Sequence, residues 1–143
     1  MQRNEYGSRR GVVACSLSHW SIADHLIADT TTNTYIVLED DIELHPHFAS
    51  SLDSLVKQSE SLDACYLGYT LTHHASQEIK DASFSIALHP TLAPFTRAYF
   101  SGATFGYLIN KTGATKLSNT LTREKLLSPI DTFDKYWKDL RMA

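Results

Sequence analysis

Long apolar stretches are missing from this chain of 143 residues. Its apolar runs, such as Tyr35–Leu38, are only a few residues long, whereas a helix that crosses a bilayer needs about 20. Cysteine is also scarce, because Cys15 and Cys65 are the only two and lie far apart. They form neither the paired C-x-x-C pattern of a zinc ribbon nor a disulfide framework. We therefore expect both to be small buried hydrophobic residues.

A large excess of charge of either sign is missing too. Lys and Arg number 13 and Asp and Glu number 16, which gives a formal net charge of −3. A mildly acidic chain is a poor candidate for a protein that binds nucleic acid through net charge. The first residues lack the apolar core of a signal peptide. The composition predicts a single globular domain over residues 1–143, with residues 1–10 as an exposed polar lead-in.

Short apolar runs alternate with helical patterns along the chain. Apolar spacing predicts helices over residues 16–28, after Pro46, over residues 112–121 and after Pro129. Strands are predicted at residues 35–38, 64–67 and 104–109, with another near 84–88. Ser16 is the expected N-cap of the first helix, and the run 35–38 is expected to be buried on both faces. This alternation is typical of an α/β fold, with a mostly parallel or mixed sheet flanked by helices.

Three consecutive carboxylates, Glu39, Asp40 and Asp41, follow the first predicted strand. Ligands of open α/β sheets bind outside the carboxyl ends of the strands. Adjacent carboxylates repel one another unless a cation or hydrogen-bond donors compensate, and Mn²⁺ or Mg²⁺ prefers oxygen ligands of this kind. The triplet therefore predicts a divalent-cation site. The alternative is that these acids are solvated and simply begin a loop or cap the next helix.

Two further residues are weaker candidates. His19 lies in the first predicted helix, where a histidine is more often a satisfied structural residue than a ligand. Asp131 precedes the last predicted helix, where it would make a good N-cap. A carboxylate at that place could also serve as a general base at the strand ends. The glycosylation sequon Asn110–Thr112 is interpreted as a chance match.

Five segments, in this order, together resemble glycosyltransferase family 25, which includes bacterial lipooligosaccharide galactosyltransferases and collagen galactosyltransferases. They are Gly11–His19 (GVVACSLSH), Tyr35–Ile42 (YIVLEDDI), Cys65–Gly68 (CYLG), Thr104–Leu117 (TFGYLINKTGATKL) and Pro129–Asp131 (PID). Each segment alone is a modest match, and the ordered set is fairly specific. The family's usual opening strand has no counterpart before Gly11, so we expect a fold that is incomplete at its nucleotide-binding start.

The resemblance implies a GT-A-like fold and an inverting transfer of a hexose, expected to be galactose, from a UDP-sugar to a saccharide or glycolipid acceptor such as lipooligosaccharide. It implies Mn²⁺ or Mg²⁺ as cofactor, held by Asp41 and Glu39, with Asp41 and Asp131 as catalytic residues. The substrate-binding residues that it implies are His19, Glu39, Asp40 and Arg97. The expected location is the cytoplasm, with at most peripheral association at the inner face of the cell membrane.

Two other functions compete with this one. A truncated or degenerate domain could keep the fold and act as a non-catalytic binding module, which the missing opening segment favours. An unrelated metal-dependent phosphotransfer or hydrolase domain could use the same three carboxylates without any sugar nucleotide. Transfer from a UDP-sugar is the leading expectation because it accounts for all five segments.

Overall fold

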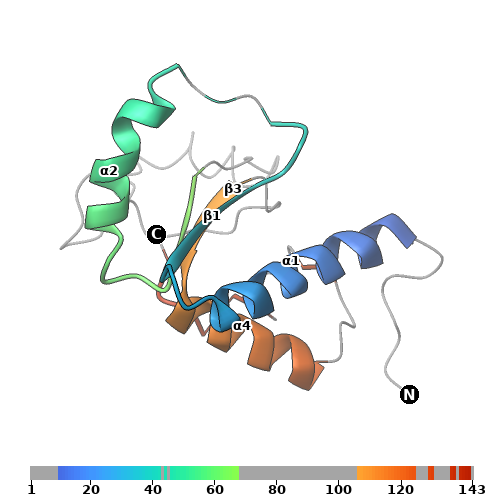
Figure 1. Ribbon diagram of the computed structural model, residues 1–143. Helices are drawn as coiled ribbons and strands as arrows, with labels where there is room; N and C mark the ends of the chain where they lie inside the picture. The colour runs from blue at the N-terminus through green and yellow to red at the C-terminus, as the bar shows by residue number, and fades with distance from the viewer. Residues whose placement is uncertain are drawn as a thin grey trace, which may run out of the picture.

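The structure is a computed structural model that describes residues 10–42, 44, 46–67, 106–124, 129–130, 136–137 and 139–142. Its helices are α1 (Arg10–Ala28), α2 (Phe48–Gln58) and α4 (Lys111–Glu124). Its strands are β1 (Thr34–Leu38), β2 (Ala64–Tyr66) and β3 (Gly106–Asn110). Helices α1 and α4 lie side by side against one face of the strands, and α2 lies on the other side (Figure 1).

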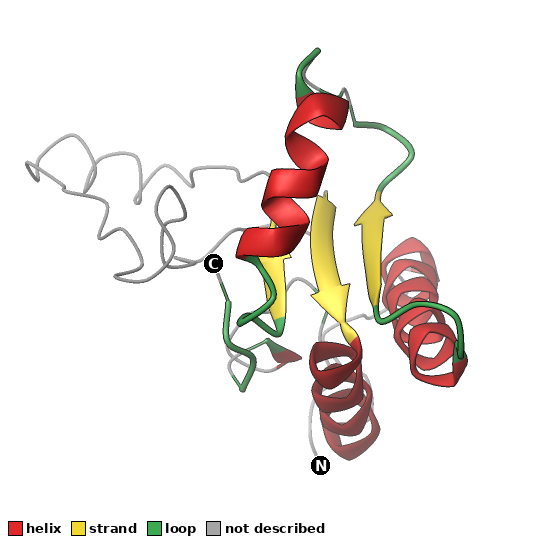
Figure 2. Cartoon of the chain, turned by 60° about the vertical axis from the view of Figure 1, so that its left-hand side comes forward, coloured by secondary structure: helices red, strands yellow, loops and turns green. Residues whose placement is uncertain are grey.

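The central strand of the described sheet is β3, which runs antiparallel to both of its neighbours. In Figure 2 its arrow points opposite to those of β1 and β2. Since β1 and β2 are both antiparallel to β3, they point the same way, and the long connection that such strands need is supplied by the segment containing α2. The two are separated by β3, so the described strands do not form the mostly parallel sheet that was one of the two expected arrangements. An isolated parallel bridge between Ala64 of β2 and Met142 adds a parallel pairing to the antiparallel ones, as in the other expected arrangement, a mixed sheet. Alternation of elements predicts their types but not which strand inserts between two others.

Alternate residues of the strands face two different helix layers, as the pleat of a β-sheet requires. Tyr107 and Ile109 of β3 join a core cluster with α1 and α4. Leu108, which lies between them, packs instead in a second cluster with Leu55 and Val56 of α2. Helices therefore cover both faces of the sheet, and the predicted α/β class is confirmed.

Helix α1 begins earlier than the sequence pattern predicts. Its buried residues are Ser16, His19, Ala23 and Leu26. The apolar residue Leu17, which lies next to Ser16 on this helix, is 47% exposed. The expected N-cap Ser16 is wrong, because its hydroxyl lies inside the helix and donates to the carbonyl of Val12 at 3.1 Å, as serines within helices do. Since the first half of the buried face is polar, hydrophobic periodicity places the start of the helix too late.

Two expectations about burial are also wrong. Strand β1 is present, but it lies at one edge of the described sheet. Only Val37 in it is fully buried, and Leu38 is 38% exposed, so the strand is not buried on both faces. Cys65 is buried as predicted, whereas Cys15 is exposed on α1. Cys15 is therefore accessible to solvent and ligands.

The other described elements agree with the sequence prediction. On α4, Ala114 and Leu117 are fully buried, as their spacing predicts. Asn110 caps this helix by accepting a hydrogen bond from the Gly113 N–H at 2.9 Å, and its amide donates to the Leu62 carbonyl at 2.6 Å. The side chain of the sequon is thus engaged in the fold. The lead-in up to residue 9, the strand near 84–88 and most of the last helix lie outside the described residues.

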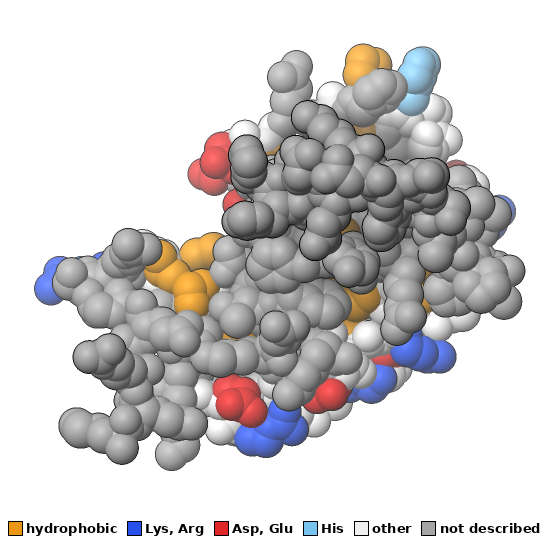
Figure 3. Space-filling view, turned by 180° about the vertical axis from the view of Figure 1, so that it is seen from behind, with side chains coloured by type: hydrophobic (Ala, Val, Ile, Leu, Met, Phe, Trp, Pro, Cys, Tyr) orange, Lys and Arg blue, Asp and Glu red, His pale blue; other side chains and the backbone are white. Residues whose placement is uncertain are grey.

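Charged side chains on the rear face are mixed in sign where the structure describes them. Figure 3 shows acidic and basic side chains next to each other along the lower edge of this face. Among the described residues, Arg123 pairs with Glu124 at 3.2 Å and with Asp139 at 3.7 Å. Opposite charges thus compensate each other locally. Within the described part of the chain, no helix has both the length and the apolar character needed to span a membrane.

Candidate functional site

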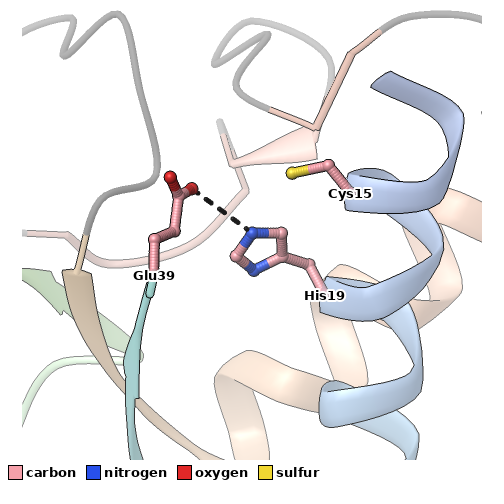
Figure 4. Close-up of side chains that lie close together, drawn as sticks. All are labelled: Cys15, His19 and Glu39. Atoms are coloured by element: carbon pink, nitrogen blue, oxygen red, sulfur yellow. Dashed lines mark ion pairs between the residues drawn. The ribbon is translucent and has the colours of Figure 1, made fainter. Parts of the chain in front are cut away.

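Side chains from α1 and the end of β1 gather at one edge of the sheet. Glu39 follows β1 directly, and Cys15 and His19 lie one turn apart on α1. Figure 4 shows the sulfur, the imidazole ring and the carboxylate directed toward the same space. One sulfur, one ring nitrogen and one carboxylate oxygen all lie within 4.8 Å of one another. Among the described residues, this is the only such group of three potential metal ligands.

The imidazole of His19 is held from both of its nitrogens. The residue is only 4% exposed. A hydrogen bond of 2.8 Å joins Nδ1 to the hydroxyl of Tyr107, which lies on β3. On the other side, Nε2 lies 3.7 Å from Oε1 of Glu39. The ring orientation is therefore set by one contact from β3 and one from the residue that follows β1, the neighbouring strand.

Burial also determines the protonation states in this group. Burial lowers the pKa of His19, and the nearby carboxylate of Glu39 opposes this effect without cancelling it. His19 is therefore neutral near pH 7, and a neutral imidazole can accept a proton or bind a metal. Burial raises the pKa of Tyr107 far above its usual value. Its hydroxyl consequently stays protonated.

Ser16 connects this edge of α1 to the segment Pro129–Ile130. Its hydroxyl accepts a hydrogen bond from the backbone N–H of Ile130 at 3.1 Å. The carbonyl of Ile130 accepts a bond from the indole N–H of Trp137 at 2.6 Å. Both backbone polar groups of Ile130 are thus held in the core, and their anchor on α1 is the residue next to Cys15.

Replacing Ser16 tests how much its hydrogen bond with Ile130 stabilises the fold. Ser16→Ala leaves the buried N–H of Ile130 without its acceptor, and we expect the free energy of unfolding to fall by about 1–3 kcal/mol. Ser18→Ala is the matched control, because its hydroxyl is exposed and bonds only one turn back, to Ala14. We expect that change to stay within about 0.5 kcal/mol. Urea denaturation measures the free energy of unfolding of both variants. Equal losses of stability in the two variants would contradict a stabilising hydrogen bond between Ser16 and Ile130.

The structure brings two of the predicted site residues together, namely His19 and Glu39. Asp40 and Asp41 lie in the turn after Glu39, and both are exposed to solvent. They do not belong to the group formed by Cys15, His19 and Glu39. Arg97 and Asp131 lie outside the described residues. The metal and catalytic roles of Asp41, and the catalytic role of Asp131, stay predictions.

Two residues of the site were not recognised from the sequence. The sequence predicts Cys15 to be a small buried hydrophobic residue, and it places Tyr107 in the strand at residues 104–109. A usable signal was present for Cys15, because residues four apart on a helix share a face and His19 is its partner at that spacing. The hydrophobic pattern begins the helix at Ser16, and so it leaves Cys15 outside the predicted helix. No sequence signal pairs Tyr107 with His19, which are 88 residues apart.

Comparison with known families gives a match over most of the chain. Residues 8–133 match the family described as Glycosyltransferase family 25 (LPS biosynthesis protein). This range includes the Cys15–His19 turn, the acidic triplet and the Pro129–Asp131 segment. No solved structure matches the chain.

Individual proteins are also similar to this chain in sequence. A protein named as a putative glycosyltransferase of Acanthamoeba polyphaga mimivirus is 35% identical over 104 residues, which is 72% of this chain and 32% of that protein. Human procollagen galactosyltransferase 2 is 30% identical over 136 residues, 92% of this chain and 20% of that protein. A bovine protein named probable inactive glycosyltransferase 25 family member 3 is 26% identical, over 87% of this chain and 20% of that protein. The chain thus spans a third or less of the length of these relatives.

Proposed function

The chain belongs to glycosyltransferase family 25, and on this premise we propose that it forms part of a glycosyltransferase that moves a hexose from a UDP-sugar to a saccharide acceptor. The observation that carries the proposal is the pairing of His19 with Glu39 at the carboxyl end of β1. This pairing joins a residue of the family segment Gly11–His19 to a residue of the family segment Tyr35–Ile42. It lies at the end of the strand where ligands of α/β sheets bind. The name of the human relative, a procollagen galactosyltransferase, supports galactose as the hexose.

A divalent cation fits the donors in the turn after β1. Glu39, Asp40 and Asp41 supply carboxylate oxygens, which suit Mn²⁺ or Mg²⁺. The two aspartates are exposed, so a diphosphate can approach them from solvent. In the proposal Asp41 and Glu39 hold the cation, which when bound supplies a positive charge for the departing diphosphate.

The reaction proposed is a single inverting displacement. The acceptor hydroxyl attacks the anomeric carbon while the bond from that carbon to the diphosphate oxygen breaks, and UDP leaves with the bonding electron pair. Asp131 takes the proton of the attacking hydroxyl as general base. Asp40, His19 and Arg97 bind and orient the substrates. Holding the reactants in line accounts for much of the rate in transfers of this kind.

Donor binding tests the proposal directly. UDP with Mn²⁺ at about 100 times its dissociation constant is expected to stabilise the chain by about 2.7 kcal/mol, a shift of several degrees in Tm. Asp41→Ala is expected to remove this shift. Asp53→Ala, an exposed carboxylate on α2, is the control that keeps it. If UDP and Mn²⁺ leave the Tm of the intact chain unchanged, the proposal fails.

The acceptor proposed is a lipid-linked saccharide such as lipooligosaccharide. The family description includes LPS biosynthesis, which supports this choice. Such an acceptor would be met at the cytoplasmic face of the inner membrane, with the chain associating only peripherally. Transfer of labelled galactose to purified lipooligosaccharide, compared with a free oligosaccharide of the same sequence, tests both the acceptor and its lipid.

The second candidate function is a non-catalytic binding module. The observation that favours it is the bovine relative, which is named as inactive and matches 87% of this chain. A module of this kind would show the Tm shift with UDP and Mn²⁺ but no release of galactose from UDP-galactose. A transferase would show both, because donor hydrolysis is the side reaction of a competent donor site.

A further inference from the structure

We propose that Cys15, His19 and Glu39 form a binding site for a transition-metal ion of the Zn²⁺ type. The proposal goes beyond the glycosyl transfer described above and does not depend on it. It shares Glu39 with the divalent-cation site proposed above, but its other two ligands, Cys15 and His19, come from α1 instead of the exposed turn that carries Asp40 and Asp41.

The geometry is close to that of a metal centre. Zinc lies about 2.0–2.2 Å from nitrogen and oxygen ligands, which places two such ligands about 3.4 Å apart around a tetrahedral ion. Nε2 of His19 and Oε1 of Glu39 are already 3.7 Å apart. All three ligand atoms, the sulfur of Cys15 included, lie within 4.8 Å of one another. The side chain of Cys15 is exposed on the helix surface, so a change of its rotamer can bring the sulfur closer.

The donor set selects the kind of metal. One thiolate, one imidazole and one carboxylate suit Zn²⁺ and similar ions, whereas Mg²⁺ and Mn²⁺ favour oxygen ligands alone. Three protein ligands leave a fourth position open, which is the pattern of catalytic rather than structural zinc sites. Because Cys15 is exposed, the site can be reached from solvent, and a water molecule or an anionic oxygen of a ligand would complete the coordination of the ion.

Tyr107 supplies the outer contact that such sites use. Metal-binding histidines usually bond through their second nitrogen to a neighbouring group, which fixes the ring. Here Nδ1 of His19 is joined to the Tyr107 hydroxyl at 2.8 Å, which leaves Nε2 for the ion on the side of Glu39. The imidazole is therefore oriented for a metal before any metal arrives.

Metal titration of the full chain tests this site. Zn²⁺ competed against a chromophoric chelator is expected to bind more tightly than Mn²⁺ or Mg²⁺, and Co²⁺ is expected to produce a thiolate-to-metal charge-transfer band. Loss of an outer-shell partner typically weakens metal binding about 10–100-fold, which is the range expected for Tyr107→Phe. Cys15→Ala, which removes a ligand, is expected to weaken it by at least about 100-fold.

The control variant is Cys65→Ala. Cys65 is buried in the cluster under α2, so its loss leaves the metal site intact and the Co²⁺ band unchanged. Cys15 is exposed, and its replacement is expected to leave the far-ultraviolet circular dichroism unaltered. Equal Zn²⁺ affinity in the intact chain and in Cys15→Ala would overturn the proposal. A preference for Mn²⁺ over Zn²⁺ in the intact chain would also overturn it.

These outcomes are separate from those of the proposed transferase. The titration uses metal alone and needs neither UDP nor an acceptor. A chain that binds Zn²⁺ through Cys15 but shows no Tm shift with UDP and Mn²⁺ keeps the metal site and loses the transferase. A chain with the opposite behaviour keeps the transferase and loses the zinc site.

Discussion

Gly113→Ala is expected to lower the free energy of unfolding by about 3 kcal/mol or more, because the helix α4 has no room for a methyl group at this position. A Cβ atom there would lie 2.2 Å from the backbone oxygen of Asp63 and 2.9 Å from its carbonyl carbon. Backbone atoms cannot rotate aside as a side chain can. Overpacking of a core typically costs about 1–3 kcal/mol, and a contact this short with backbone falls at or above the upper end.

The matched control is Gly11→Ala on α1. A Cβ atom at Gly11 meets nothing within 4 Å, and alanine is favoured over glycine within a helix by about 0.5–1 kcal/mol. We therefore expect this variant to be as stable as the original chain or slightly more stable. Urea denaturation of both variants measures the difference. A Gly113→Ala variant as stable as Gly11→Ala would show that α4 does not pack against Asp63 in this way.

Asp63→Ala is expected to destabilise the chain by about 3 kcal/mol. The carboxylate is fully buried and accepts bonds from Lys116 Nζ at 2.6 Å and from Arg141 Nη2 at 3.1 Å. It also accepts the backbone N–H of Arg141 at 2.8 Å. Removing one partner of a buried ion pair costs about 3–5 kcal/mol. The lower end applies here, because the two basic side chains are partly exposed and can be hydrated after the change.

The same residue makes stability depend on pH. Burial alone raises the pKa of Asp63, but the hydrogen bonds from Arg141 and Lys116 outweigh it and hold the pKa below the usual value. A group with a lowered pKa contributes its full stability above the unfolded value of about 4, and loses it as the pH falls through the folded pKa. The intact chain should therefore lose stability below about pH 4 more steeply than Asp63→Ala.

The control for both effects is Asp139→Ala. Asp139 is exposed and pairs with Arg123 at 3.7 Å, and exposed pairs contribute about 0–1 kcal/mol. Its loss is expected to change neither the stability nor the slope of the acid limb noticeably. Urea denaturation from about pH 7 down to about pH 3 measures the two curves. A gap between the intact chain and Asp63→Ala that stays constant over this range would show that the charge of Asp63 is not its source.

One of the segments that match the family contains both structural residues and residues of the candidate site. The segment Thr104–Leu117 includes Gly113, whose small size lets α4 approach Asp63. The same segment carries Tyr107, which holds the ring of His19. Asn110 lies between them and caps α4. Resemblance over such a segment therefore reports on the packing of the fold as much as on its chemistry.

A local sequence pattern was sufficient to predict a helix or strand where one short segment contains all the residues of that pattern. The strand predicted at residues 35–38 is confirmed. It could be predicted because its apolar run, rich in β-branched and aromatic residues, is short and ends abruptly in acidic residues. Helix α4 was predicted because Ala114, Leu117 and Leu121 recur at helical spacing. The prediction is confirmed, and all three residues are buried. Helix α1 was placed too late because Ser16 and His19, its polar buried residues, give no hydrophobic periodicity.

The sequence by itself determined the α/β class, the acidic end of β1 and the family, because each depends on residues that are neighbours in the chain or recur at a fixed spacing. Only the tertiary structure decided that β3 separates β1 from β2. It also decided that Cys15 and Glu39, which are 24 positions apart by their numbers, reach the same imidazole. The physical reason is that strand order and helix docking depend on packing between distant segments, and no local periodicity records that packing.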